Sequence, residues 1–249
     1  MKKFIITRIG LNFPEKDKID STHLQNNPDY IAKTIMDMLD FTYPSIKNQT
    51  AKEIVWVFFT GSRFTDNHRK LIEDVVEVPI VFIKDIEYRQ TKKPWEHEES
   101  IVMRLDADDF MHPTLIEKVE KNLLEKYTGD NIVICSPEKG YKLYPDLSLT
   151  EFQTTQIALG LGVISNCGAG VLHDHSRLVQ TYNSAFPNKE VIINNIVSDE
   201  KLYLYRRHEM AHSFACDLNY KDRVKIDNPL EILNDFGVLK TIYWKKRNV

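Results

Sequence analysis

The chain has 249 residues, with 33 basic and 36 acidic side chains, a formal net charge of -3 and a hydrophobic fraction of 42%. This length and apolar content suffice for one large domain or two small ones with a substantial core. The near balance of charge argues against nucleic acid or an anionic membrane as the partner. No apolar run approaches the roughly 20 residues that span a bilayer, and charge returns at Arg8, so we expect neither a transmembrane segment nor a signal peptide. Widely spaced cysteines give no disulfide or zinc pattern, which suits a cytoplasmic location.

The first half of the chain alternates predicted strands with predicted helices. A buried strand is expected over residues 3–9, and helical spacing follows over residues 29–41, with Pro28 just ahead of it. Further strands are expected at 52–60, 78–83 and 100–103, with a helix at 67–75 between the first two of these. This order predicts an α/β protein with a mostly parallel central sheet and helices on both faces.

The second half has shorter and less regular elements. We expect a helix at 113–127, a strand at 131–135, a hairpin edge at 139–144 and strand-like pieces at 163–166 and 169–172. A helix at 176–183, a last strand at 202–208 and a short helix after Pro229 complete the prediction. We interpret residues 1–249 as a single domain, with halves at 1–112 and 113–215 and a tail at 216–249, because the linkers are too short for a clear division.

Three carboxylates follow the strand at 100–103, in the sequence Arg104-Leu105-Asp106-Ala107-Asp108-Asp109. Crowded acids repel one another and are poor strand formers, and a divalent cation is the usual compensation. Oxygen ligands suit Mg²⁺ or Mn²⁺, which also bind phosphates. If strand alternation continues, Arg104, Asp106 and Asp108 share a side. The alternative is a solvated acidic turn that caps the next helix.

The acidic sequence is one of several strand ends that a parallel sheet brings to a common edge, where ligands of such sheets bind. The others carry Thr7 and Arg8, Thr60 to Arg63, and residues 83–85. Two arginines beside acidic side chains suit a metal ion with a phosphorylated ligand. The alternative is that Arg8 and Arg63 simply pair with nearby acids.

The acidic sequence resembles the Asp-x-Asp motif of glycosyltransferases with the GT-A fold. The opening Phe4-Ile5-Ile6-Thr7-Arg8 and the late Tyr205-Arg206-Arg207-His208-Glu209-Met210-Ala211-His212-Ser213 are similar to a rhamnosyltransferase family of bacteria and viruses. This resemblance covers about residues 1–215. Thr60 stands near the position where related enzymes carry an acidic residue beside the nucleotide base, so the identity of that base is left open.

The resemblance implies a GT-A-like, Rossmann-like fold with a smaller acceptor-side subregion. It implies a hexosyltransferase that takes a sugar, with rhamnose as one candidate, from a nucleotide-sugar donor bound by residues 1–112. The acceptor would be a glycan or another hydroxyl compound bound by residues 113–215. Asp108 is implied as the leading ligand of Mn²⁺ or Mg²⁺, Asp106 as a ligand of the metal or the ribose, Asp109 as support and His208 as a late metal ligand or diphosphate contact. The candidates for nucleotide-sugar binding are Thr7, Arg8, Thr60, Arg63, Arg104 and Asp106.

A transferase that inverts the sugar also needs a general base. The candidates are Asp174, between His173 and His175, and the adjacent acids Asp199 and Glu200, and the sequence does not choose among them. A nucleotidyltransferase would carry a glycine-rich basic loop after its first strand, but residues 9–12 contain one glycine. A metal-dependent phosphatase would carry its nucleophilic acid on the first strand, but here the acidic sequence follows the fourth. A non-catalytic member of the same fold that binds a glycan or a partner is the remaining alternative.

Overall fold

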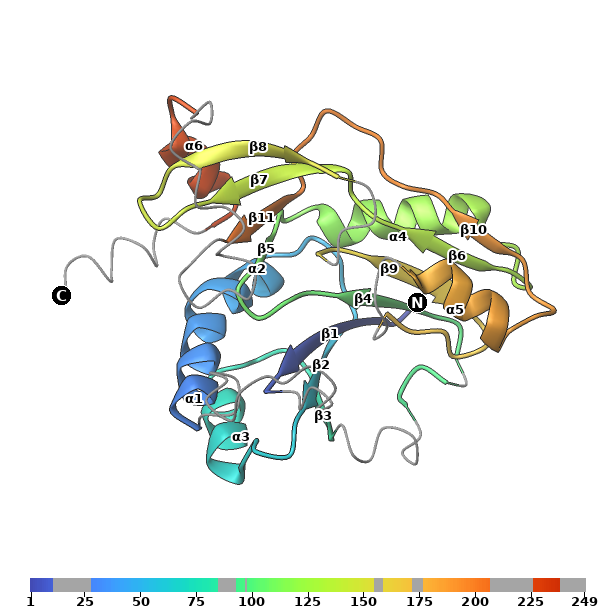
Figure 1. Cartoon of the computed structure of the whole chain (residues 1–249), viewed down its shortest axis with the longest axis horizontal. Coiled ribbons are helices and arrows are strands. Elements are labelled where there is room, and N and C mark those ends of the chain that lie inside the picture. The colour runs from blue at the N-terminus through green and yellow to red at the C-terminus, as the bar shows by residue number, and fades with distance from the viewer. Residues whose placement is uncertain are drawn as a thin grey trace, which may run out of the picture.

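The computed structural model of the chain describes residues 1–10, 28–84, 93–96, 98–154, 159–171, 177–206 and 226–237 (Figure 1). In chain order, its elements are β1 (Lys3–Ile9), α1 (Pro28–Asp37), η2 (Met38–Thr42), α2 (Tyr43–Lys47), β2 (Ile54–Thr60), α3 (Asp66–Glu73), β3 (Ile80–Lys84), β4 (Ser100–Arg104) and β5 (Phe110–Met111). They continue with α4 (Leu115–Lys126), β6 (Ile132–Cys135), β7 (Lys139–Leu143), β8 (Leu149–Gln153), β9 (Gly162–Ser165), α5 (Leu178–Ala185), β10 (Val191–Ile193), β11 (Tyr203–Arg206) and α6 (Pro229–Asp235).

A large, mostly parallel sheet forms the centre of the molecule. Its strand order within the described residues is β10-β6-β9-β4-β1-β2-β3. Strand β1 pairs in parallel with β2 and β4, and the pairs β2–β3 and β6–β10 are also parallel. Strand β9 runs antiparallel to both of its neighbours, β4 and β6. The α/β class and the mostly parallel sheet that the sequence predicts are therefore confirmed, and one continuous sheet joins strands from both halves of the chain.

Alternating side chains of this sheet fill two separate apolar layers, because successive residues of a strand point to opposite faces. One layer joins Ile5 and Trp56 to side chains of α1, α3 and α4. The other joins Phe4 and Val57 to Leu178 and Tyr182 of α5. Helices cover both faces, with α1 and α3 near one end of the sheet and α5 near the other (Figure 1).

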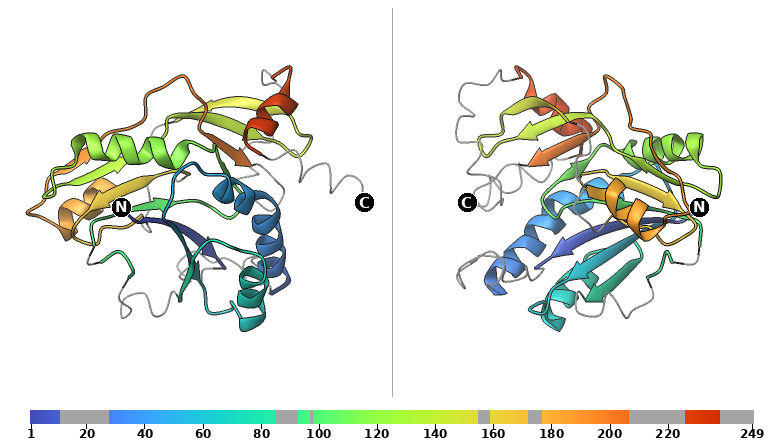
Figure 2. Two further views of the ribbon diagram at one scale, coloured as in Figure 1. Left: turned by 180° about the vertical axis from the view of Figure 1, so that it is seen from behind. Right: turned by 45° about the vertical axis from the view of Figure 1, so that its right-hand side comes forward.

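A smaller sheet, in the order β5-β11-β7-β8, stands beside the large one. Figure 2 shows it with α6 above the large sheet in both views. One of its faces packs Leu143, Leu149 and Leu204 against Leu233 and Phe236 of the α6 region and against Phe41. This sheet connects directly to the central one, because β5 begins only a few residues after β4 ends.

The structure corrects two local predictions. The segment at 139–144 is no edge, because β7 lies between β11 and β8. Residues 169–171 form no strand, and the preceding Gly168 has a φ of +78°, which extended strands do not adopt. No helix in the described ranges is long and apolar enough to cross a membrane.

Candidate functional site

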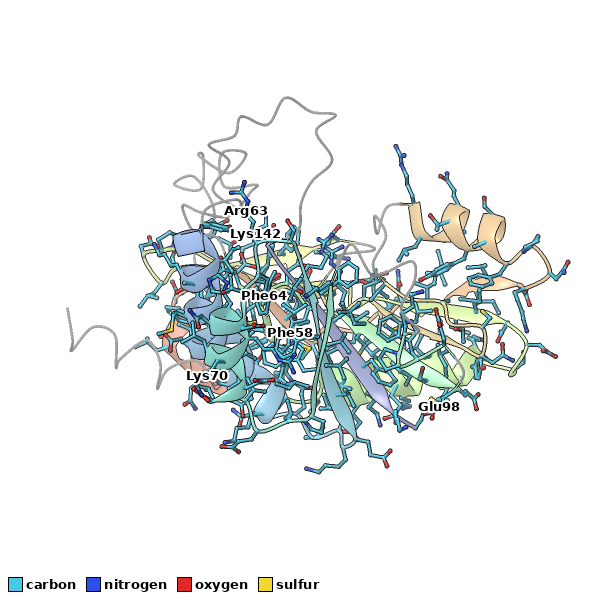
Figure 3. All side chains as sticks on the ribbon, turned by 90° about the horizontal axis from the view of Figure 1, so that it is seen from below. Phe58, Arg63, Phe64, Lys70, Glu98 and Lys142 are labelled. Carbon is cyan, nitrogen blue, oxygen red and sulfur yellow. The ribbon has the colours of Figure 1, made fainter. Side chains whose placement is uncertain are left out.

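The parallel strands β1, β2, β3 and β4 end along one edge of the large sheet. Their pairing registers run in step, with Ile9 beside Thr60 and Thr60 beside Lys84. Figure 3 shows the two ends of these strands, with Arg63 just after β2 and Glu98 just before β4 on opposite sides. The edge that Arg63 marks is the one where ligands of parallel α/β sheets bind.

Residues 105–109, which we call the acidic loop, continue β4 at this edge. Leu105, Ala107 and Asp109 are buried, whereas Asp106 and Asp108 are half-buried. The amide of Leu105 donates to the Ile6 carbonyl at 3.0 Å, which keeps the loop attached to β1. Buried and half-buried side chains thus alternate through the loop, which turns at Ala107 and Asp108, and Asp106 and Asp108 are its more exposed acids.

Two arginines hold Asp106. Arg104 Nε donates to Asp106 Oδ1 at 3.1 Å and Arg104 Nη2 donates to Oδ2 at 3.4 Å. Arg8 Nη2 lies 3.8 Å from Asp106 Oδ1 and adds a second, longer ion pair. The buried Nε of Arg8 has no hydrogen-bond partner among the described residues, so this guanidinium keeps a donor for an anionic ligand. This contact confirms the prediction that the side chains of Arg104 and Asp106 lie on the same side of the strand.

Asp109 is fully enclosed and ties the acidic loop to the smaller sheet. Its side chain is 1% exposed, and Oδ1 accepts a hydrogen bond from the backbone amide of Arg206 at 3.1 Å. Burial raises the pKa of Asp109 well above its usual range, and the neighbouring carboxylates Asp108 and Asp106 raise it further. Asp109 therefore supports the loop from inside, while Asp106 and Asp108 are the carboxylates that a ligand can reach.

Helix α1 adds two side chains that the sequence did not single out, Tyr30 and Asp37. Burial raises the pKa of Tyr30, a hydrogen bond with Thr34 lowers it, and the charges of Asp108 and Asp37 raise it again, so the phenol lies within electrostatic reach of both acids. Tyr30 and Asp37 are seven residues apart, which is two turns on one face of a helix. This spacing is visible in the sequence, but the electrostatic influence of Asp108, some 70 residues later, on Tyr30 is not.

The threonines predicted to bind the nucleotide sugar are buried parts of the sheet edge. Thr7 Oγ1 donates to the Leu105 carbonyl at 2.8 Å and accepts from Trp56 Nε1 at 2.9 Å. Thr60 is 1% exposed, and its hydroxyl donates to the Ile83 carbonyl at 3.4 Å. These hydroxyls are used to join strand ends, which leaves Arg8, Arg63 and Asp106 as the predicted contacts with access to solvent. Arg63 is exposed in the turn after β2.

The predicted general bases are not brought to the acidic loop. Asp199 and Glu200 precede β11, whereas the acidic loop meets the other end of that strand at Arg206. Asp199 pairs with Lys139 at 2.7 Å, and Glu200 pairs with Lys118. The Lys139 contact lowers the pKa of Asp199, which weakens it as a base. Asp174 lies outside the described residues, so its role stays a prediction.

Two of the three predicted metal ligands, Asp106 and Asp108, lie within the described residues. Within the described ranges, no group of three or more His, Cys, Asp or Glu side chains forms a metal site, and His208 lies outside those ranges. Asp106 and Asp108 fit a different arrangement, in which Mg²⁺ takes one or two carboxylates and completes its shell with substrate phosphates and water. Asp106 is already held by Arg104, so a metal bound to this carboxylate would share it with the guanidinium.

Comparison with known proteins gave structural neighbours only: no family model and no curated protein matches the chain. The S. aureus TarS 1–349 structure covers 83% of this chain at 11% identity with a TM-score of 0.39, and this chain covers 60% of it. TarS 1–349 in complex with UDP-GlcNAc gives 9% identity over 84% of this chain and 59% of that one, with a TM-score of 0.40. The 4-diphosphocytidyl-2C-methyl-D-erythritol synthase of Anaerococcus prevotii gives 10% identity over 96% of both chains, with a TM-score of 0.38. At these TM-scores, the structural likeness does not define a function for this chain.

Proposed function

We propose that the chain is a glycosyltransferase that binds a nucleotide-diphosphate sugar at the acidic loop and transfers its sugar to a hydroxyl acceptor. The observation that carries this proposal is the pairing of Asp106 with Arg104 and Arg8 beside a second, solvent-facing carboxylate, Asp108, at the carboxyl ends of parallel strands. Cationic donors and acidic metal ligands side by side suit a diphosphate with its divalent cation. The resemblance to the Asp-x-Asp glycosyltransferases supports the same assignment.

The chemistry follows from the charge that develops on the leaving group. When the anomeric bond breaks, negative charge gathers on the diphosphate, and preorganised cationic donors stabilise it. Arg8 meets this requirement, because its guanidinium is fixed near Asp106 and its Nε is not used by the described residues. Arg104 keeps the Asp106 carboxylate in place. A divalent metal held by Asp108, with Asp106 or His208 as further ligands, would supply Lewis-acid stabilisation of the diphosphate.

The finer parts of the proposal rest on the family resemblance alone. They are Mn²⁺ or Mg²⁺ as the cation, rhamnose as a candidate sugar, a hexosyl transfer and a glycan as acceptor. Asp174 is the remaining candidate for the general base that an inverting transfer needs, since Asp199 and Glu200 lie at the other end of β11.

The test is calorimetric binding of UDP, GDP, CDP and dTDP, each with and without Mn²⁺, followed by a screen of the matching sugar nucleotides for hydrolysis or transfer. We expect one diphosphate to bind in a Mn²⁺-dependent manner and Asp108→Asn to weaken that binding at least about tenfold, since a lost charged ligand costs about 1.4 kcal/mol or more. Asp74→Asn, in an exposed ion pair with Lys70, is the matched control and should bind as the parent does.

Two results contradict the proposal. If no diphosphate binds in the presence of Mn²⁺, or if Asp108→Asn binds as tightly as Asp74→Asn, the nucleotide-sugar site is refuted. If a diphosphate binds but no sugar nucleotide turns over, the enzymatic part fails and a non-catalytic binding protein of this fold is favoured.

A further inference from the structure

The inner side of the acidic loop rests on a π-helical segment, η2, between α1 and α2. Thr42 is the last residue of η2 and is completely buried, and its hydroxyl donates to the Ala107 carbonyl at 2.9 Å. The Thr42 carbonyl in turn accepts from the Ser45 hydroxyl at 2.7 Å. π-Helical turns are rare and occur often at functional sites, where the extra residue redirects a side chain. Here the segment directs a hydroxyl at the backbone midway between Asp106 and Asp108.

A second anchor comes from the end of β11. The Arg206 amide donates to Asp109 Oδ1, and the Arg206 guanidinium carbon lies 4.1 Å from the centre of the Phe41 ring, so this cation stacks on η2. Arg206 Nη1 is 3.6 Å from Asp37 Oδ2, at the end of α1. The Phe41 ring also meets Phe110 edge-on at a centroid distance of 5.8 Å. Segments far apart in the sequence therefore converge behind the acidic loop.

We infer that Phe41, Thr42 and Arg206, which we call the latch, are positioning residues that set the direction of the Asp106 and Asp108 carboxylates. The loop is fastened from inside at Ala107 and at Asp109, the residues on either side of Asp108. With both neighbours fixed, the Asp108 backbone has one orientation and its carboxylate one approach to a ligand. Phe41 is 7% exposed and Thr42 is 0% exposed, so neither reaches a ligand and each acts only through the loop.

The identity of the ligand in this inference rests on the proposed function, whereas the mechanical part does not. Thr42→Val keeps the side-chain shape and removes the donor, which leaves the Ala107 carbonyl without that partner. Thr42→Ser keeps the hydroxyl and should restore the parent behaviour. Phe41→Leu removes the ring beneath Arg206 and tests the second anchor independently. Thr150→Val is the matched control, because Thr150 is a buried threonine on β8 whose hydroxyl contacts Tyr144 at 3.4 Å.

The experiment measures two quantities on each full-length variant. Hydrogen exchange is followed by mass spectrometry in peptides that span residues 105–111, where the Asp109 amide donates to the Asp106 carbonyl at 3.3 Å. Affinity is measured by calorimetry for UDP, GDP, CDP and dTDP with Mn²⁺. For Thr42→Val we expect about tenfold faster exchange of these peptides and about tenfold weaker binding of whichever diphosphate the parent binds, the loss expected for one buried hydrogen bond. Phe41→Leu should change both quantities in the same direction, and Thr42→Ser should stay within about twofold of the parent.

The possible outcomes test separately whether the latch holds the loop and whether it affects ligand binding. Unchanged exchange over residues 105–111 in both Thr42→Val and Phe41→Leu overturns the latch. Faster exchange with unchanged affinity overturns the positioning role, and so does an affinity loss of equal size in Thr150→Val, which would reflect general destabilisation. If the parent binds no diphosphate, the proposed function fails, while the exchange data still decide whether the latch holds the loop.

Discussion

Replacing Arg104 with methionine should destabilise the protein by a measurable and calculable amount. Arg104 has a side chain only 7% exposed and makes two hydrogen bonds to a carboxylate that is 33% exposed. Hydrogen bonds to charged groups contribute about 1.5–3 kcal/mol, and solvent screening at Asp106 reduces this, so we expect a loss of about 1–2 kcal/mol. For a domain of this size that corresponds to a Tm lower by about 2–8 °C. Urea titration of Arg104→Met against the parent gives the free energy of unfolding directly.

The control is Lys70→Met, which removes a cation from an exposed ion pair with Asp74, whose side chains are 73% and 57% exposed. Solvent screens such pairs, so the free energy of unfolding of this variant should match that of the parent within the error of the titration. A double-mutant cycle with Asp106→Asn should give a coupling free energy of about 1 kcal/mol between Arg104 and Asp106. If Arg104→Met costs no more than Lys70→Met, or if the coupling is zero, the claim that Arg104 fixes Asp106 is refuted.

Three further substitutions test other features. Burial and neighbouring carboxylates raise the pKa of Asp109, so its contribution to stability is complete below the unfolded pKa of about 4 and is lost as the pH rises through the folded pKa. In EDTA, the Tm of the parent should therefore fall relative to that of Asp109→Asn as the pH rises above about 4, and parallel pH profiles would contradict this. Trp56→Phe removes the Nε1–H donor to Thr7 and part of a buried ring, and should cost about 2–3 kcal/mol in urea titration; a cost under about 0.5 kcal/mol would contradict the contact. Gly140→Ala would place a methyl group 2.4 Å from the Tyr203 ring and should cost about 1–3 kcal/mol, whereas an unchanged Tm would show that the ring moves freely.

The sequence predicted the central strands well because each contains a short run of consecutive apolar residues. Residues 3–9 were predicted as a strand, and β1 has those bounds. Strand alternation predicted that Arg104 and Asp106 share a side, since residues two apart on a strand do so, and their contact agrees with that prediction. The predicted helix at 29–41 is divided in the structure, because α1 ends at Asp37 and η2 begins at Met38. Apolar spacing does not distinguish α-helical from π-helical hydrogen bonding, so that change was not predictable.

The parts of the site that the sequence did not reveal depend on contacts between distant segments. Tyr30 gains significance only because the charge of Asp108 reaches it, and Asp37 only because it pairs with Arg206. Arg206 itself matters because β11 ends against Asp109. The direction of β9 was equally hidden, because an apolar strand buried on both faces carries the same residues whichever way it runs. Local sequence patterns predicted the helices, the strands and the acidic loop. Tertiary packing determined which other residues surround that loop.

The reversed strand β9 also determines when the central sheet can form completely during synthesis, because the sheet needs β9 between β4 and β6. Strand β4 is exposed along one side until the chain passes Ser165 and β9 inserts between β4 and β6. A nascent or truncated chain that stops near residue 112 carries β4 as an open edge, with a row of unpaired backbone donors and acceptors that invites pairing with another chain. The first half therefore lacks the strand that covers this edge of β4 in the full chain. Expressed fragments and split-protein designs should keep β4 and β9 in the same polypeptide. Stable products of limited proteolysis should also contain both strands.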